Sequence, residues 1–258
     1  MPEGDSLRRA AERVSVLVGQ RVAVESPHPR AAALGLAPRL DGRVLERVEA
    51  VGKNLLLSFE GGLVLRSHLM MRGRWHVGPV GARRGRGLPW LVLRGVEHEA
   101  VLWHGPVLEL GRGAVERLGP DVLAEPLDLA GIVARLRAGE PARHLADALL
   151  DQRCVAGIGN LWRAEALFLA GASPFVQIGE ATDELVERVV VAASDAMKAG
   201  RGARWAYGRA GLPCRRCGTP IASRRLGEQA RTISWCPTCQ PGPEPPRAPG
   251  TGAARRGR

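Results

Sequence analysis

The chain has 258 residues, 45% of them hydrophobic, with five cysteines and a formal net charge of +11 at pH 7. It contains no apolar run of about eighteen residues and no charged-then-apolar start, so we expect a cytoplasmic protein without a membrane span or signal peptide. Residues 201–258 hold twelve arginines and two glutamates, and therefore +10 of the net charge. A basic segment of this kind indicates a polyanionic partner.

The chain starts Met1-Pro2-Glu3-Gly4. Removal of the initiator methionine, which a small second residue permits, would give Pro2 a free secondary amine. An α-amine is about 10% unprotonated at neutral pH, against well below ~0.1% for a lysine. Such an amine can condense with an aldehyde to give an iminium, and Glu3 could transfer protons beside it. Many chains start with Met-Pro, so this start predicts catalysis only in combination with other residues.

The predicted elements fall into two regions. Asp5 or Ser6 can cap a first helix with apolar residues at helical spacing. Short β-rich runs follow, broken by glycines, which indicates a β-sandwich or barrel; after Pro120 the periodicity is helical. The expected strands are Arg43–Ala50, Asn54–Phe59, Leu63–His68, Arg74–Val77, Leu91–Val96 and Ala100–Trp103, and the expected helices are Leu129–Ala138, His144–Leu150, Leu161–Ala170 and Asp183–Ala199.

Two segments of the strand-rich region carry unusual residues. Lys53 is one of two lysines in a chain with thirty-five arginines, and it precedes a predicted strand. A lysine, unlike an arginine, is a compact charge that can lose its proton. Residues 67–73, Ser-His-Leu-Met-Met-Arg-Gly, run from a strand end into a turn. Met70 and Met71 there either pack into the sandwich or contact an apolar partner from an exposed loop.

Four cysteines form two C-x-x-C pairs, with eighteen residues between the pairs. This spacing is typical of a zinc ribbon whose four thiolates leave no position for water, so we predict one structural Zn²⁺. The segment around Pro213 also resembles half of a zinc nucleobase deaminase motif, but no histidine is followed two residues later by the glutamate of the other half. The predicted ligands are Cys214, Cys217, Cys236 and Cys239.

Five segments together resemble the formamidopyrimidine-DNA glycosylase and endonuclease VIII family of base-excision repair enzymes, and the likeness is greatest to actinobacterial endonuclease VIII. They are Met1-Pro2-Glu3-Gly4, Gly52-Lys53, Ser67-His68-Leu69-x-Met71-x-Gly73, Gly157-Ile158-Gly159-Asn160 and the four cysteines. The resemblance covers residues 1–240 and implies an α+β fold. Its parts are an N-terminal β-sandwich catalytic domain with a leading helix (1–117), a helix–two-turn–helix DNA-binding domain (118–200) and a zinc finger (201–240). The basic tail (241–258) lies outside the resemblance, and its five prolines and four glycines predict disorder.

The resemblance also implies an activity, that of a bifunctional DNA glycosylase/AP lyase that removes oxidised bases and cuts the strand by β,δ-elimination. Pro2 would attack C1′ and hold the sugar as an imine, with Glu3 as proton donor and acceptor. Lys53 would contact phosphate and assist β-elimination, and Arg231 would bind phosphate and serve δ-elimination. The partner would be double-stranded DNA with a damaged base or an abasic site, bound by a monomer that is nucleoid-associated while on DNA.

The resemblance implies that four further residues bind DNA. Asn160 would grip the backbone around the lesion with help from His68, and Met70 and Met71 would fill the gap left by the displaced base.

The sequence departs from the family pattern at three places. Ser6 stands where the family commonly has glutamate, and Arg72 stands where endonuclease VIII usually has tyrosine. Residues 104–109 lack the arginine–phenylalanine pair of the purine-lesion branch. The missing pair favours oxidised pyrimidines over oxidised purines.

Two other hypotheses remain open from the residues alone. A non-catalytic protein that binds damaged DNA explains the cysteines and the charge, but it gives Pro2, Glu3 and Lys53 no joint purpose. A zinc-ribbon factor of the transcription type leaves the strand-rich half unexplained.

Deletion of residues 241–258 is expected to weaken DNA binding mostly at low salt, because the tail adds charge rather than specific contacts. Affinity for a duplex, measured against salt concentration for both lengths of the protein, checks this. Equal salt slopes for the full-length and shortened chains would contradict it.

Overall fold

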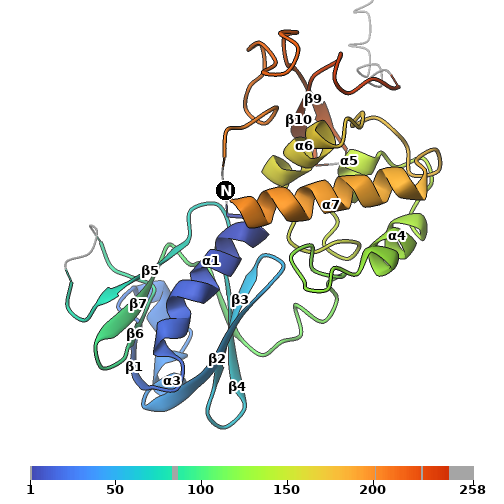
Figure 1. The fold of residues 1–258 in the computed structure, drawn as a ribbon. Helices are drawn as coiled ribbons and strands as arrows, with labels where there is room; N and C mark the ends of the chain where they lie inside the picture. The colour runs from blue at the N-terminus through green and yellow to red at the C-terminus, as the bar shows by residue number, and fades with distance from the viewer. Residues whose placement is uncertain (1, 83–86, 201, 228, 244–258) are drawn as a thin grey trace, which may run out of the picture.

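The structure is a computed structural model that describes residues 2–82, 87–200, 202–227 and 229–243. It has a strand-rich half and a helical half that carries a small two-stranded hairpin (Figure 1). Across these residues, no helix is both long and apolar enough to cross a membrane. Most of the predicted tail, from residue 244 onward, lies outside the described residues.

Helix α1 (Gly4–Val14) leads from the junction of the two halves along the strands (Figure 1). The predicted cap is wrong: the N-cap residue is Glu3, without a side-chain capping bond, and Asp5 and Ser6 lie in the first turn. The buried face of the helix packs against the sandwich core and consists of Leu7, Ala10, Ala11 and Val14. Glu3 leaves its own helix uncapped because its carboxylate binds elsewhere, as described below.

The strand-rich half is an antiparallel β-sandwich, as predicted. Its strand order is β5-β7-β6-β1-β2-β3-β4-β8, and β1 and β2 share only two paired positions, so the chain of strands turns between two layers there. Alternate residues of β3, including Leu55, Leu57 and Phe59, fill the core between the layers. The strands are β1 (Arg21–Glu25), β2 (Arg43–Val51), β3 (Asn54–Phe59), β4 (Leu63–His68), β5 (Arg74–Pro79), β6 (Leu91–Arg94), β7 (His98–Trp103) and β8 (Val107–Leu110); η1 (Ser15–Leu17), α2 (Pro29–Ala32) and α3 (Ala37–Leu40) are short helices.

The predicted strands and helices recur with small differences at their ends. β6 ends before Gly95 because the N–H of Gly95 turns back to the carbonyl of His98. The helices are α4 (Leu129–Arg137), α5 (Leu145–Ala148), α6 (Asn160–Leu169) and α7 (Asp183–Ala199). Asp128 and Thr182 cap α4 and α7 through side-chain oxygens, as short polar residues at N-caps commonly do. Helix α5 is shorter than predicted, and Asn160 begins α6 instead of preceding it.

The hairpin of β9 (Ala222–Leu226) and β10 (Arg231–Trp235) is docked on the helical half. Leu226, Ile233 and Trp235 are buried in the same core as the helices, and Trp235 meets the ring of Phe175 edge-on at 4.8 Å between centroids. The hairpin therefore has a fixed place beside α6, as Figure 1 shows.

Two backbone contacts close the junction between the halves. The N–H of Gly4 donates to the carbonyl of Gly157 at 3.0 Å, and the N–H of Gly52 donates to Asp121 Oδ2 at 2.6 Å. A Cβ on Gly4 would lie 3.0 Å from Gly157 Cα and 3.1 Å from Met197 Cε, so only glycine fits without displacement. These contacts set the distance between the start of α1 and the start of α6.

Gly4→Ala is therefore expected to lower the free energy of unfolding by about 1–3 kcal/mol, the usual cost of overpacking. Thermal or urea denaturation measures it. Gly113→Ala is the control, because a Cβ there would meet nothing within 4 Å. Equal stability of the two variants would show that the junction has room for a methyl group.

Candidate active site and nucleic-acid interface

Glu3 is buried at the N-terminal end of α6. Its Oε2 accepts hydrogen bonds from the N–H groups of Gly159 (2.9 Å) and Trp162 (3.2 Å), and its Oε1 accepts one from Leu161 (2.8 Å). The first N–H groups of a helix have no partner within it, and this end of the helix dipole is positive, so a carboxylate is stabilised there. A Cβ on Gly159 would lie 2.3 Å from Glu3 Cδ, which explains the glycine. The start of the chain thus caps a helix far along the sequence.

Lys53 lies in the β2–β3 turn at the junction of the halves. Gly52 has a φ of +57°, which favours glycine, and its Cβ would lie 3.1 Å from Ala156 Cβ. The turn can therefore press against the segment that precedes α6. This places the Lys53 ammonium where it and the Glu3 carboxylate act on each other's charge.

Burial shifts the protonation of both groups toward their neutral forms. It raises the pKa of Glu3, against the opposing effect of the three N–H groups and of Lys53. It lowers the pKa of Lys53 to about 8; the Glu3 carboxylate opposes that shift and the Arg231 guanidinium adds to it. An acid and a base that are both perturbed toward neutral pH are suited to exchanging protons.

Pro2 is half-buried and directly precedes Glu3. The Glu3 carboxylate and the Gly4 N–H are both hydrogen-bonded to the segment at the start of α6. Pro2 is the residue directly before them, so it lies next to the Glu3–Lys53 pair. The structure therefore brings Pro2, Glu3 and Lys53 together, from segments that are separate in the sequence.

Asn160, at the start of α6, bonds to the residue that follows Arg231. The Asn160 Nδ2 donates to the carbonyl of Thr232 at 3.0 Å, and Thr232 follows Arg231 in β10. The charge of Arg231 also lowers the pKa of Lys53 and of Arg163, so it lies close to both. The predicted phosphate-binding residues thus surround one end of α6, and cations outnumber carboxylates there.

The segment after β4 is exposed, so the hypothesis that its methionines pack into the sandwich is wrong. Met70 and Met71 are 48% and 66% exposed, while Leu69 between them and the sheet is buried. Met70 has a φ of +49°, and its N–H donates to His68 Nδ1 at 3.0 Å. Burial, and then the charges of Arg66 and Lys53, lower the pKa of His68, so its ring is neutral at pH 7.

The four predicted metal ligands form one cluster. Their sulfur atoms all lie within 4.8 Å of one another; the Cys214 and Cys239 sulfurs are 3.9 Å apart, and those of Cys217 and Cys236 are 3.5 Å apart. A tetrahedral zinc with Zn–S bonds of about 2.3 Å requires sulfurs roughly 3.8 Å apart. The N–H groups of Arg216 and Cys239 also point at Cys214 and Cys236 sulfurs. The cluster therefore fits a four-thiolate metal ion.

Sequence reasoning missed three buried or partly buried residues that organise this region. Asp121 holds the Lys53 turn through Gly52 and also accepts from the Leu123 N–H. Arg163 is fully buried on α6 and bonds to three different elements. Glu165 accepts the N–H groups of Trp205, Ala206 and Tyr207, which fixes the approach to the cysteines. A charged residue within a helical pattern normally indicates a solvent-facing position, so Arg163 and Glu165 did not stand out, and Asp121 lies outside any helix or named strand.

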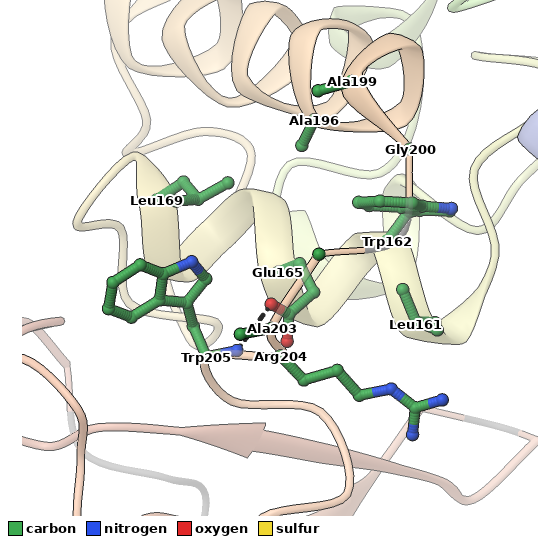
Figure 2. Close-up of a pocket in the computed structure, with 11 residues that line it drawn as sticks. Leu161, Trp162, Glu165, Leu169, Ala196, Ala199, Gly200, Ala203, Arg204 and Trp205 are labelled. Carbon is green, nitrogen blue, oxygen red and sulfur yellow. Dashed lines mark hydrogen bonds between the residues drawn. The ribbon is translucent and has the colours of Figure 1, made fainter.

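A cavity of about 170 Å³ lies beside the start of α6, between α6, α7 and the segment that follows α7 (Figure 2). Leu161 and Trp162, whose N–H groups bind Glu3, contribute to its wall, and Arg204 lies at its edge. The opposite wall is held in place by a hydrogen bond from the Trp205 N–H to the Glu165 carboxylate, which is drawn in Figure 2. The cavity is lined mostly by apolar side chains and adjoins the Glu3 site.

Two family descriptions match the chain. The formamidopyrimidine-DNA glycosylase N-terminal domain matches residues 1–104, and the formamidopyrimidine-DNA glycosylase H2TH domain matches residues 118–202. A β-sandwich with an N-terminal carboxylate held by this helical domain is therefore the arrangement of a DNA repair glycosylase. The chain belongs to the formamidopyrimidine-DNA glycosylase and endonuclease 8 family, which confirms the predicted family and the predicted enzyme class, DNA glycosylase and AP lyase.

Curated relatives and solved structures agree with this assignment. A probable endonuclease 8 2 of Streptomyces coelicolor is 38% identical and covers 99% of this chain and 100% of its own length. The DNA-(apurinic or apyrimidinic site) lyase Nei2 of Mycolicibacterium smegmatis is 37% identical over 93% of this chain and 99% of its own. A complex of the Lactococcus lactis Fpg with abasic-site DNA has a TM-score of 0.77 at 22% identity, covering 94% of this chain and 99% of that one, and supports the fold.

The charges around Lys53 generate a prediction. Glu3→Gln should lower the pKa of Lys53 below about 8, because the carboxylate that favours the ammonium is lost; Arg231→Ala should raise it, because a repelling cation is lost. Reductive ¹³C-methylation and an NMR titration measure it, and the spectrum is simple because Lys53 and Lys198 are the two lysines. Lys198 is the internal control. Shifts of Lys53 in the opposite directions would contradict the assignment of these neighbours.

Proposed function

We propose that the protein is a bifunctional DNA glycosylase/AP lyase that removes oxidised bases, pyrimidines in preference to purines, from double-stranded DNA. The observation that carries the proposal is the burial of the Glu3 carboxylate on the N–H groups of α6, next to Pro2 and Lys53. A non-catalytic DNA-binding protein has no use for a desolvated acid and a lysine of lowered pKa beside the terminal residue.

In the proposed reaction, the Pro2 amine forms a bond to C1′ of the damaged nucleotide, and the base leaves with the electron pair of the glycosidic bond. Glu3, whose pKa is raised by burial, transfers a proton as the sugar ring opens. The resulting iminium acidifies the C2′ proton. Removal of that proton expels the 3′ phosphate, and a further elimination expels the 5′ phosphate.

Two cationic residues and one neutral amide around the start of α6 are proposed to hold the two phosphates. Lys53, Arg231 and Asn160 lie on separate elements that converge there, and clamps of this kind stabilise charge on leaving phosphates. Neutral His68 donates from Nε2, since its Nδ1 accepts the Met70 N–H. Exposed Met70 and Met71 are suited to entering the gap left by a displaced base.

The cysteine cluster is proposed to hold one structural Zn²⁺ through Cys214, Cys217, Cys236 and Cys239. When bound, the ion stabilises the fold of the finger and supplies no chemistry to the reaction, because four thiolates complete its coordination. Its effect on DNA binding is to fix the hairpin that carries Arg231. The division into 1–117, 118–200, 201–240 and 241–258, and action as a monomer, are part of the same proposal.

Borohydride trapping on a duplex with one abasic site tests the chemistry. The wild type should give a covalent protein–DNA band that maps to Pro2 by mass spectrometry. Pro2→Gly should weaken or abolish the band and strand cleavage while binding survives, because the secondary amine is lost.

Glu3→Gln should slow turnover, because a glutamine bound to the N–H groups of α6 cannot transfer a proton to the substrate. Absence of any crosslink from wild-type protein with a confirmed N-terminal proline and intact binding would overturn the enzyme proposal in favour of a protein that only binds damage.

A further inference from the structure

Arg163 is a fully buried arginine in the first turns of α6 that the proposed reaction does not use. Its guanidinium bonds in three directions. It donates to Asp147 Oδ1 at 3.2 Å and to the carbonyl of Ala146 at 3.4 Å on α5, to Asn160 Oδ1, and to the carbonyl of Thr232 on β10 at 3.3 Å. A planar guanidinium presents donors in a fixed fork, so it can hold three elements in one relative arrangement.

Asp147, the partner of Arg163, also touches the hairpin. A Cβ on Gly227, in the turn that follows β9, would lie 2.7 Å from the Asp147 carboxyl. The turn therefore rests directly on this carboxylate, and Gly227 with its φ of +71° permits the approach. The pair thus joins Asp147 of α5 to the buried Arg163 of α6, with Arg163 bonded to β10 and Asp147 in contact with the β9–β10 turn.

The same pair decides how Asn160 is oriented. The Asn160 Oδ1 accepts a hydrogen bond from Arg163, and one N–H of the Asn160 Nδ2 donates to the Thr232 carbonyl. Arg163 donates to that same carbonyl. The remaining N–H of Asn160 is thereby aimed by contacts within the protein. Since Arg231 adjoins Thr232, the position of its side chain relative to Asn160 follows from the same contacts.

We propose that Arg163, paired with Asp147, is a positioning residue that locks the hairpin onto α5 and α6 and so sets the spacing between Asn160 and Arg231. This inference rests on the proposed function, because it assigns the pair an effect on the step that releases the second phosphate. Among the described residues, no hydrogen bond or ion pair joins Pro2, Glu3 or Lys53 to the pair, although the Glu3 charge raises the pKa of Arg163. We therefore expect formation of the imine not to require the pair.

The test compares wild type with Arg163→Met and with Arg163→Met/Asp147→Leu on an abasic duplex, with protein in excess. The double variant is included because removing one member alone leaves a buried unpaired charge, whereas replacing both with apolar residues is often tolerated. Arg137→Met is the matched control: Arg137 binds carbonyls of Ile178 and Ala181 and the Asp183 carboxylate, all within the helical half and away from the hairpin.

The expected result is that both Arg163 variants lose δ-elimination product by about tenfold or more relative to β-elimination product, a loss typical of misplaced groups. The rate of borohydride trapping on Pro2 should stay within about twofold of wild type, and Arg137→Met should keep the wild-type product ratio. Thermal melting and zinc content identify any variant that is unfolded.

Two outcomes would overturn the inference: a wild-type product ratio in the folded double variant, or an equal loss of trapping and of δ-elimination. Failure of the proposed function gives another result that can be told apart from these two: the wild-type protein would then form no trapped complex.

Discussion

The bond between the Glu3 carboxylate and the N–H groups at the start of α6 is the constraint on which the rest of the structure depends. It joins the third residue of the chain to a helix in the other half. A Cβ on Gly159 would collide with the Glu3 carboxyl, and one on Gly4 would crowd Gly157 and Met197 beside it. The strand-rich half and the helical half are consequently held at one distance. Each half has its own core, but the site exists only at their junction.

Burial at this junction has a chemical consequence. A carboxylate on a helix N-terminus is usually stabilised as an anion, yet here desolvation outweighs the N–H groups and raises the pKa of Glu3. The same desolvation lowers the pKa of Lys53. The fold thus converts two ordinary charged residues into an acid and a base that can act near neutral pH, at a cost in stability that the surrounding packing offsets.

The hairpin supplies the complementary half of the interface. The cysteine cluster shapes its base, while Trp235 and Ile233 bury it in the helical core and Arg163 bonds to its backbone. The cysteine cluster and the hydrophobic docking thus hold the same small element, and Trp235, which is buried in the helical core, directly precedes Cys236 of the cluster. Arg231 on its second strand lies close enough to the start of α6 for its charge to lower the pKa of both Lys53 and Arg163.

Local patterns in the sequence determined the type of most elements, the cysteine cluster and the family. Asn54–Phe59 and Leu63–His68 follow from short β-rich runs broken by glycines, and Asp183–Ala199 follows from its helical spacing. The roles of Pro2, Glu3, Lys53 and Asn160 came from resemblance, not from spacing. Only the tertiary structure decided that Glu3 caps α6, that Met70 and Met71 are exposed, and that Arg163 and Asp121 organise the site. Those facts depend on contacts between residues up to 159 positions apart, and no local rule encodes them.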